Sequence, residues 1–282
     1  MLIVRNIAEV RAALAQLRAD RRCIGLVATM GALHEGHLSL VRAAKAHCNA
    51  VVATIFVNPT QFAPGEDFAK YPRTFEADCK LLETEGVDVL FAPEAAEIYP
   101  TGASTVVEVA GISDRLDGVS RPGHFVGVAT VVAKLFNIVQ ANHAFFGQKD
   151  AAQVAVLRRM VRDLHFNLEL VVCPTVREPD GLAMSSRNRY LSAEERQQAL
   201  VLRRALQRVE EEIAAGVLDA EPLIDVGLAV LAEEPEIRVD YLKIVDPETL
   251  EDVADASAGA LVAVAAVVGP ARLIDNVVIP PR

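Results

Sequence analysis

Apolar runs that alternate with helical patterns are the feature that most constrains this 282-residue chain. The spacing predicts helices over 7–19, about 38–48 and about 74–85, and strands over 23–29, 50–57 and 87–93. Runs that are apolar along their whole length are typical of strands covered on both faces. Because a helix separates each strand from the next, the strands pair in parallel through right-handed crossovers. The pattern therefore predicts an α/β fold with a Rossmann-like, doubly wound parallel sheet.

The rest of the sequence continues this pattern up to residue 175 and departs from it after that. Up to residue 175 the sequence predicts a strand over 105–109, an apolar helix over 125–140, a strand and glycine turn over 143–150, a helix over 151–164 and a strand over 168–175. Ser192 with Glu195 is a capping-box signature for one long helix that runs to about Ala215. A further helix near 221–232 and apolar runs at 237–245 and 261–268 follow. We therefore predict two domains, 1–175 with about five parallel strands and 176–282 as a smaller α+β C-terminal domain.

Composition limits the classes of partner. The formal net charge of −10 disfavours nucleic acid and anionic membranes. The N-terminus lacks the uninterrupted apolar stretch of a signal peptide, and the run 258–268 is too short to cross a bilayer, so a buried strand explains it better. The four cysteines are widely spaced without a CxxC pair. This spacing predicts reduced, buried thiols in a cytoplasmic protein and disfavours zinc ribbons and redox dithiols.

Residues 29–37, TMGALHEGH, join a predicted strand to a predicted helix through a glycine-bearing turn. Gly31 and Gly36 allow close backbone approaches, and the first amides of the helix have no partner inside it, so this place suits a phosphate. His34 and His37 add hydrogen-bond donors there. Each histidine alone could equally be a surface residue or a polar helix start. Catalytic zinc needs three protein ligands and no third ligand motif accompanies the pair, so we predict no protein-held metal.

Three further polar clusters follow predicted strands or lie in the connector between the domains. They are Asn58–Gln61, Gly147–Asp150 with Gln153 one helical turn later, and Met184–Arg187. Each is a weak signal alone, since glutamines often satisfy backbone groups and most Lys and Arg side chains are solvated. Ser185 and Ser186 lack the GxSxG elbow of a serine hydrolase. Together, the clusters predict one site at the carboxyl ends of the strands.

At this point the sequence resembles the pantothenate synthetase (pantoate–β-alanine ligase) family of the HIGH-motif nucleotidyltransferase superfamily. The matching stretches span nearly the whole chain in the family's order: TMGALHEGH (29–37), IFVNPTQF (55–62), YPRTFEADC (71–79), FAPEAAEIYP (91–100), SRPGHFVGVATVVAKLFN (120–137), FFGQKDAAQ (145–153), DGLAMSSRNRYLS (180–192) and ARLIDN (271–276). HEGH stands for the HIGH motif and MSSR for the KMSKS-like loop. Two positions depart from the family pattern: Gln148 often corresponds to Glu, and Ala152 to Gln.

The resemblance implies a two-step ligase reaction. ATP and pantoate give a pantoyl adenylate and pyrophosphate, and the amine of β-alanine then attacks the adenylate to release pantothenate and AMP. It also implies Mg²⁺ on the outer phosphates, small-molecule partners only, a cytoplasmic location and a homodimer. The implied catalytic residues are His37, as transition-state donor and candidate general acid, with His34, Lys149, Arg187, Ser185 and Ser186.

The resemblance further implies which residues bind each substrate. ATP would contact Met30, Gly31, Ala32, Leu33, His34, Glu35, Gly36, His37, Gly147, Gln148, Lys149, Asp150, Val176, Met184, Ser185, Ser186 and Arg187. Gln61 and Gln153 suit pantoate, because an amide pairs with hydroxyl and carboxylate oxygens at once, and Gln61 also suits β-alanine. Asn58, Tyr71 and Arg121 are expected at the substrate pocket and its rim. Pro59, Pro64, Gly65 and Pro72 predict a mobile lid over 60–75.

Two other functions stay open at this stage. One is a nucleotidyltransferase that makes a dinucleotide, and the other is a non-catalytic ATP-binding regulator. Formation of AMP, rather than ADP or nothing, from ATP, pantoate and β-alanine separates the three. The sequence leaves open the order of substrate binding, the protein ligands of Mg²⁺ and which histidine, if either, transfers a proton.

Overall fold

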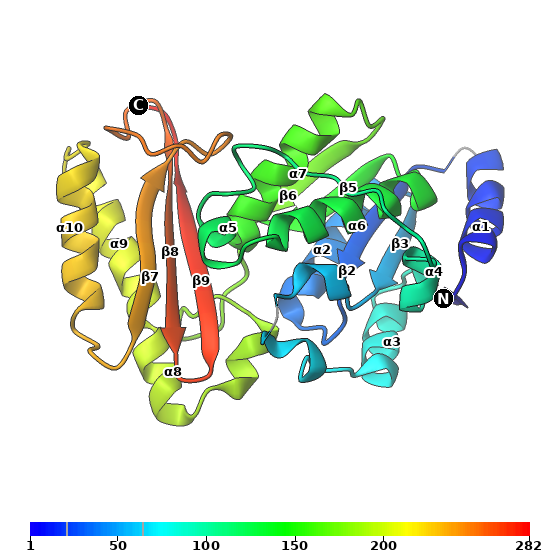
Figure 1. Cartoon of the computed structure of the whole chain (residues 1–282), viewed down its shortest axis with the longest axis horizontal. Coiled ribbons are helices and arrows are strands. Elements are labelled where there is room, and N and C mark those ends of the chain that lie inside the picture. The colour runs from blue at the N-terminus through cyan, green and yellow to red at the C-terminus, as the bar shows by residue number, and fades with distance from the viewer. Residues whose placement is uncertain (21, 64) are drawn as a thin grey trace.

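A parallel sheet and a smaller antiparallel sheet stand side by side in the computed structural model, which describes residues 1–20, 22–63 and 65–282 (Figure 1). Pro64 of the predicted lid therefore lies outside the described residues. The strands are β1 (Leu2–Val4), β2 (Ile24–Thr29), β3 (Ala50–Ile55), β4 (Val89–Phe91), β5 (His143–Gly147), β6 (Glu169–Cys173), β7 (Arg238–Val245), β8 (Ala260–Val268) and β9 (Ala271–Ile279). The helices are α1 (Ile7–Ala19), α2 (Glu35–His47), α3 (Phe75–Thr84), α4 (Ala95–Ile98), α5 (Asp117–Ser120), α6 (His124–Val139), α7 (Ala151–Asp163), α8 (Ala193–Ala199), α9 (Val201–Ala214) and α10 (Ala220–Leu231).

The parallel sheet has the strand order β1-β4-β3-β2-β5-β6 and is doubly wound, as the sequence predicts. Successive residues of one strand contact different layers. Leu26 of β2 packs in the cluster with α1, α6 and α7, whereas Val27 packs in the cluster with α2 and α3. Since alternate side chains point to opposite faces of a strand, burial on both faces explains the continuous apolar runs. The chain order reverses between β2 and β5, and this switch point creates a crevice at their carboxyl ends.

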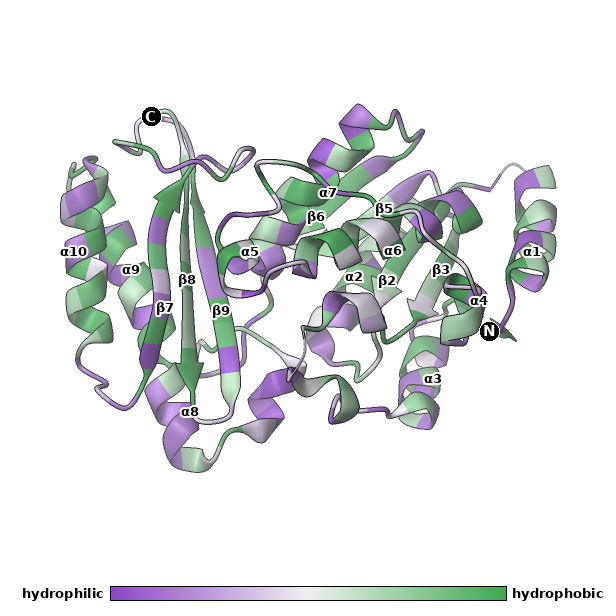
Figure 2. Cartoon of the chain, in the orientation of Figure 1, coloured by the Kyte–Doolittle hydropathy of each residue, from purple (hydrophilic) through white to green (hydrophobic). Residues whose placement is uncertain are grey.

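The antiparallel sheet β7-β8-β9 carries α9 and α10 on one face and turns the other toward the parallel-sheet unit (Figure 1). Its middle strand is apolar along its length, whereas both neighbouring strands carry polar residues (Figure 2). Leu261 and Ala263 join the core of the larger unit, and Val262 and Val264 join the core under α9. The run around 258–268 is thus a buried strand, as predicted.

Two sequence predictions of secondary structure are wrong. Residues 105–109 form no strand: Val109 is buried, Val106 is exposed, and the Val107 amide donates to Thr130 Oγ1 of α6 at 2.8 Å. The segment therefore lies against the surface of α6 instead of pairing with a neighbouring strand. The predicted long helix keeps its capping box but divides into α8 and α9, because the Leu200 amide bonds to the Gln197 carbonyl three residues back.

Strands β1 and β9 were not predicted. β1 is a three-residue edge strand, too short for a periodic signal, so the sheet has one strand more than the predicted five. β9 alternates polar and apolar residues and was noted only as part of a motif.

Among the described residues, no helix is long and apolar enough to cross a membrane.

Candidate active site

The predicted nucleotide turn lies at the switch point. β2 ends at Thr29 and β5 at Gly147, and the two strands pair in parallel, so the turns that follow them are neighbours. α2 begins at Glu35 and α7 at Ala151, which places two helix N-termini beside the same crevice. Unpaired helix amides and the helix dipole favour negative charge there.

A buried carboxylate holds the turn between β2 and α2. Gly31 and Ala32 both have positive φ values, 80° and 51°. Asp78 of α3, only 2% exposed, accepts hydrogen bonds from the Ala32 and Leu33 amides at 2.9 Å each. An alanine in the left-handed region is costly unless its surroundings fix it, and Asp78 supplies that constraint. The sequence contained Asp78 within a family motif but offered no signal for this role.

His34 and His37 form the N-terminal cap of α2 with their side chains. His34 Nδ1 accepts from the Gly36 amide at 3.2 Å, and His37 Nδ1 accepts from the His34 amide at 3.3 Å. The rings lie against each other with centroids 4.1 Å apart. A Cβ on Gly36 would lie 2.9 Å from His34 Cε1, so the ring requires glycine there. With Nδ1 occupied as an acceptor in both rings, each neutral ring carries its proton on Nε2.

Both histidines are held neutral. Burial, with the nearby charge of Lys149, lowers the pKa of His34 to about 4. Burial, with the His34 ring and Lys149, lowers the pKa of His37 to about 3. At pH 7 each ring is therefore a neutral Nε2–H donor. Neither offers a free nitrogen lone pair to a metal ion.

Most of the residues expected to bind ATP line one cavity of about 170 Å³ beside α2. Those residues are Met30, His34, Gly36, His37, Gly147, Lys149, Asp150, Val176, Met184, Ser185, Ser186 and Arg187. Five others do not line it. Gly31, Ala32 and Leu33 are buried in the turn, Glu35 is exposed and pairs with Arg42, and Gln148 bonds to Asn276 at 3.0 Å. These five support or flank the cavity.

A second cavity of about 210 Å³ opens off the first and shares Met30, His37 and Asp150 with it. All five residues expected near the acid substrate line it: Asn58, Gln61, Tyr71, Arg121 and Gln153. Its remaining lining is largely apolar and comes mainly from α6 and neighbouring strands. The cavity can therefore accept a small molecule with both polar and branched apolar parts.

Asn58 positions Gln61. It is 1% exposed, and its amide group donates to Gln61 Oε1 and to the Gly127 carbonyl at 3.1 Å each. Gln61 Nε2 in turn lies 2.9 Å from Met30 Sδ. A Cβ on Gly127 would lie 2.3 Å from the Thr60 carbonyl oxygen, so glycine is needed for α6 to approach this turn. These contacts fix Gln61 in the wall of the second cavity, beside Met30.

Comparison with known proteins bears directly on this geometry. A family model described as pantoate–β-alanine ligase matches residues 2–278. The chain belongs to this family. A pantothenate synthetase of Acidobacterium capsulatum is 66% identical, with 97% of this chain and 95% of the relative covered. One from Thermotoga petrophila is 54% identical over 99% of this chain and all of the relative.

Solved structures of pantothenate synthetases share the fold over the whole chain. A crystal structure from Thermus thermophilus has a TM-score of 0.95 at 51% identity and covers 100% of both chains. A Francisella tularensis pantoate–β-alanine ligase has a TM-score of 0.77 at 34% identity and covers 99% of this chain and 97% of that one. That protein is described as complexed with β-γ ATP and β-alanine.

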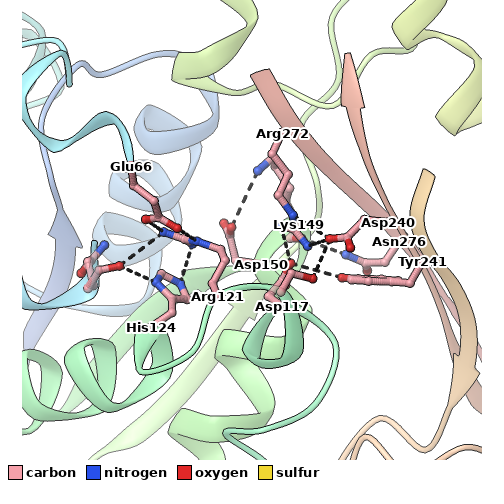
Figure 3. Close-up of polar contacts among 12 residues, drawn as sticks. Glu66, Asp117, Arg121, His124, Lys149, Asp150, Asp240, Tyr241, Arg272 and Asn276 are labelled. Atoms are coloured by element: carbon pink, nitrogen blue, oxygen red, sulfur yellow. Dashed lines mark hydrogen bonds and ion pairs between the residues drawn. The ribbon is translucent and has the colours of Figure 1, made fainter. Parts of the chain in front are cut away.

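In this member of the pantoate–β-alanine ligase family, an arginine–histidine network lines the second cavity. Arg121 forms two hydrogen bonds with the Glu66 carboxylate at 2.7 Å and donates to His124 Nε2 at 2.9 Å (Figure 3). His124 Nδ1 therefore carries the proton and donates to the Gln61 carbonyl at 2.8 Å. Burial and the Arg121 charge lower the pKa of His124 to about 4. Sequence reasoning missed His124 and Glu66.

The antiparallel sheet holds the turn that carries Lys149. Asn276 of β9, 5% exposed, donates to the carbonyls of Gln148 and Lys149 at 2.9 Å each. Beside it, Arg272 pairs with Asp117 at 2.6 Å and Asp240 at 2.7 Å (Figure 3). The ARLIDN stretch was noted in the sequence, but only the fold reveals that it fixes Lys149 across the boundary between the sheets.

Proposed function

We propose that this chain condenses pantoate with β-alanine at the expense of ATP, as members of its family do. The observation that carries the proposal is the meeting of two cavities at His37. One cavity is lined by phosphate-type donors and the other by two glutamines and an apolar wall. A carboxylate bound in the glutamine-lined cavity would then lie next to a phosphate bound in the other cavity. Adenylation requires this arrangement.

The first cavity suits a triphosphate. Neutral Nε2–H groups of His34 and His37, the Lys149 ammonium, the hydroxyls of Ser185 and Ser186 and the Arg187 guanidinium all line it. Such donors are set before the reaction begins, so they stabilise developing charge without reorganising. Val176 and Met184 add backbone and apolar surface for the rest of the nucleotide.

The second cavity suits pantoate, which carries a carboxylate, two hydroxyls and a branched dimethyl carbon. Gln61 and Gln153 can pair with the oxygen atoms, and the apolar wall that includes Val131 and Phe146 can contact the dimethyl group. Tyr71 and Arg121 lie at the same pocket. Asn58 acts through Gln61 in this proposal rather than by direct contact.

The proposed reaction has two steps. The pantoate carboxylate attacks the α-phosphorus of ATP, and pyrophosphate leaves with the electron pair of the broken P–O bond. The β-alanine amine then attacks the acyl carbon of the pantoyl adenylate, an amide bond forms, AMP leaves and the amine loses a proton. We assign His37 and His34 to neutral hydrogen-bond donation rather than proton transfer, because their lowered pKa values leave them no extra proton at neutral pH.

A divalent cation such as Mg²⁺ fits the oxygen donors near the phosphates. Asp150 lines both cavities and its carboxylate is about half exposed. Mg²⁺ is usually bound through one or two carboxylates together with substrate phosphates, so Asp150 is the residue we assign. When bound, the ion would neutralise charge on the outer phosphates.

Three broader assignments remain proposals. The family resemblance and the exposed apolar residues Leu2 and Ile3 at the sheet edge support a homodimer through the N-terminal unit. The four free thiols support a cytoplasmic location. We place the domain boundary at 175/176, between β6 and the connector. Light scattering after size exclusion tests the first of these.

The decisive test of function is product analysis. The purified protein is incubated with ATP and Mg²⁺, with pantoate and β-alanine added separately and together. The proposal requires pyrophosphate release that depends on pantoate, and AMP with pantothenate when both acids are present. ADP, dinucleotide or no turnover would each contradict it.

A further inference from the structure

Two cysteines and a histidine converge at the amino end of the parallel sheet, away from the substrate cavities. Cys23 directly precedes β2, Cys48 caps the end of α2, and His143 is the first residue of β5. The two Sγ atoms are 2.8 Å apart, and each lies 3.4 Å from His143 Nδ1. Among the described residues this is the one group of at least three His, Cys, Asp or Glu side chains whose ligand atoms all approach within 4.8 Å.

The histidine is oriented to present a lone pair to the thiols. Its other nitrogen, Nε2, lies 3.4 Å from the Glu169 carboxylate, and Glu169 is its partner in register on β6. A carboxylate near Nε2 favours the tautomer that has its proton on that nitrogen, in which Nδ1 is an acceptor. The same carboxylate–histidine pair commonly orients histidine ligands in metal sites.

We propose that Cys23, Cys48 and His143 bind one Zn²⁺ ion, with water as the fourth ligand. Two thiolates and one imidazole form a ligand set used for zinc, whose bonds to sulfur and nitrogen are about 2.3 and 2.0 Å long. Tetrahedral bonds of these lengths separate sulfur and nitrogen by about 3.5 Å, close to the 3.4 Å found here. The two sulfur atoms must move apart by about 1 Å, and Cys23, the partly exposed thiol, is the one able to move outward.

Binding at this site is an acid–base reaction without electron transfer. Each thiol loses its proton to solvent as a sulfur–zinc bond forms, so one zinc ion releases two protons. Affinity should therefore increase with pH. The ion would join the start of β2, the end of α2 and the start of β5, the three elements whose opposite ends carry the substrate site.

Cobalt spectroscopy tests the proposal on the full-length, freshly reduced protein. One equivalent of Co²⁺ should give a thiolate-to-cobalt charge-transfer band and the visible bands of tetrahedral cobalt, and Zn²⁺ should abolish both. The Cys23→Ser variant should lose most of the charge-transfer intensity, and His143→Gln should shift the visible bands. Cys173→Ser, at a buried thiol outside the cluster, is the matched control and should bind as wild type.

Thermal unfolding provides a second readout. A hundredfold excess of Zn²⁺ over its dissociation constant should raise the Tm of the wild type by about 5 °C, but not that of Cys23→Ser. The proposal is overturned by the absence of a charge-transfer band, or by a band that keeps its full intensity in Cys23→Ser. It is also overturned if the protein, with both thiols shown to be reduced by mass and thiol titration, binds no Co²⁺.

Discussion

The two ends of β2 use histidine in opposite ways. At the carboxyl end, His34 and His37 accept backbone amides on Nδ1 and turn Nε2–H groups toward the cavity. At the amino end, His143 faces a carboxylate with Nε2 and two thiols with Nδ1. The first arrangement suits an anion and the second a soft cation. The partner of the second ring nitrogen, rather than the presence of histidine, therefore determines which ligand each site can take.

Removing a donor at the carboxyl end should have the largest effect. We expect His37→Ala to reduce pantoate-dependent pyrophosphate release by about 100-fold or more, because a preorganised donor to the transition state is lost. His37→Gln retains an N–H donor and should recover part of the rate. A His37→Ala rate within about threefold of wild type, well under 1 kcal/mol, would refute the assignment.

Neutralising Asp78, the carboxylate that holds the turn before the two histidines, should reduce kcat more than neutralising Asp88 at the amino end of the sheet. Asp78→Asn places an NH₂ group against backbone donors, so the turn shifts and kcat should fall about tenfold. Asp88 accepts the Val51 amide at 2.8 Å near the amino end of the sheet and is the matched control. Asp88→Asn should lower Tm without changing kcat. Equal losses of kcat in both variants would contradict a specific role for Asp78 in holding the turn.

Removing the contact that Asn276 of the antiparallel sheet makes with the Lys149 turn should reduce kcat by a smaller factor. Asn276→Leu removes two donors to the carbonyls of the Lys149 turn, and we expect kcat to fall by about three- to tenfold. Asn137→Leu is the control, since the Asn137 side chain bonds to the Ala133 carbonyl within α6. Rapid-quench measurement of adenylation should show the loss in the first step. An unchanged rate would mean that Lys149 is fixed by other contacts.

The low pKa values of His34 and His37 should make the stability of the folded protein modestly dependent on pH. Their pKa values are about 4 and 3 in the folded protein, below the value of 6.5 for an unperturbed histidine. As pH falls below about 6.5, the unfolded chain binds protons that the folded chain does not, so stability decreases. The His34→Gln/His37→Gln variant should lose part of this dependence of Tm on pH. Imidazole ¹⁵N shifts should report two neutral rings protonated at Nε2 at pH 7; charged rings there would contradict the assignment.

The smallest effect is expected from the cysteine cluster. In metal-free buffer, Cys23→Ser should change kcat and KM by less than about twofold, since the cluster lies at the other end of the sheet from the reacting groups. The steady-state assay that measures pantothenate is sufficient. A large loss of kcat would show that the two ends are coupled and would remove the basis of the comparison.

Sequence reasoning named most of the residues that line the two cavities but not the contacts that hold them. Strands followed by polar residues predicted where Gln61, Lys149 and the two histidines would meet, because carboxyl ends of parallel strands share one edge. It assigned no role to Asp78, His124 or Asn276, each of which acts through a partner at least about 45 residues away. It also placed Glu35 in the ATP site, whereas the helical turn directs it to Arg42 on the surface.

The doubly wound sheet and the family followed from the sequence, since periodicity and local motifs depend on neighbours in the chain. Only the tertiary structure decided that Asn58 supports Gln61, that Arg121 is tied to Glu66 and His124, and that two distant cysteines meet a histidine. Spacing along the chain had disfavoured zinc ribbons and redox dithiols and gave no sign of this pairing. Such pairings depend on which strand ends become neighbours, a choice made by packing across the sheet and therefore absent from local sequence.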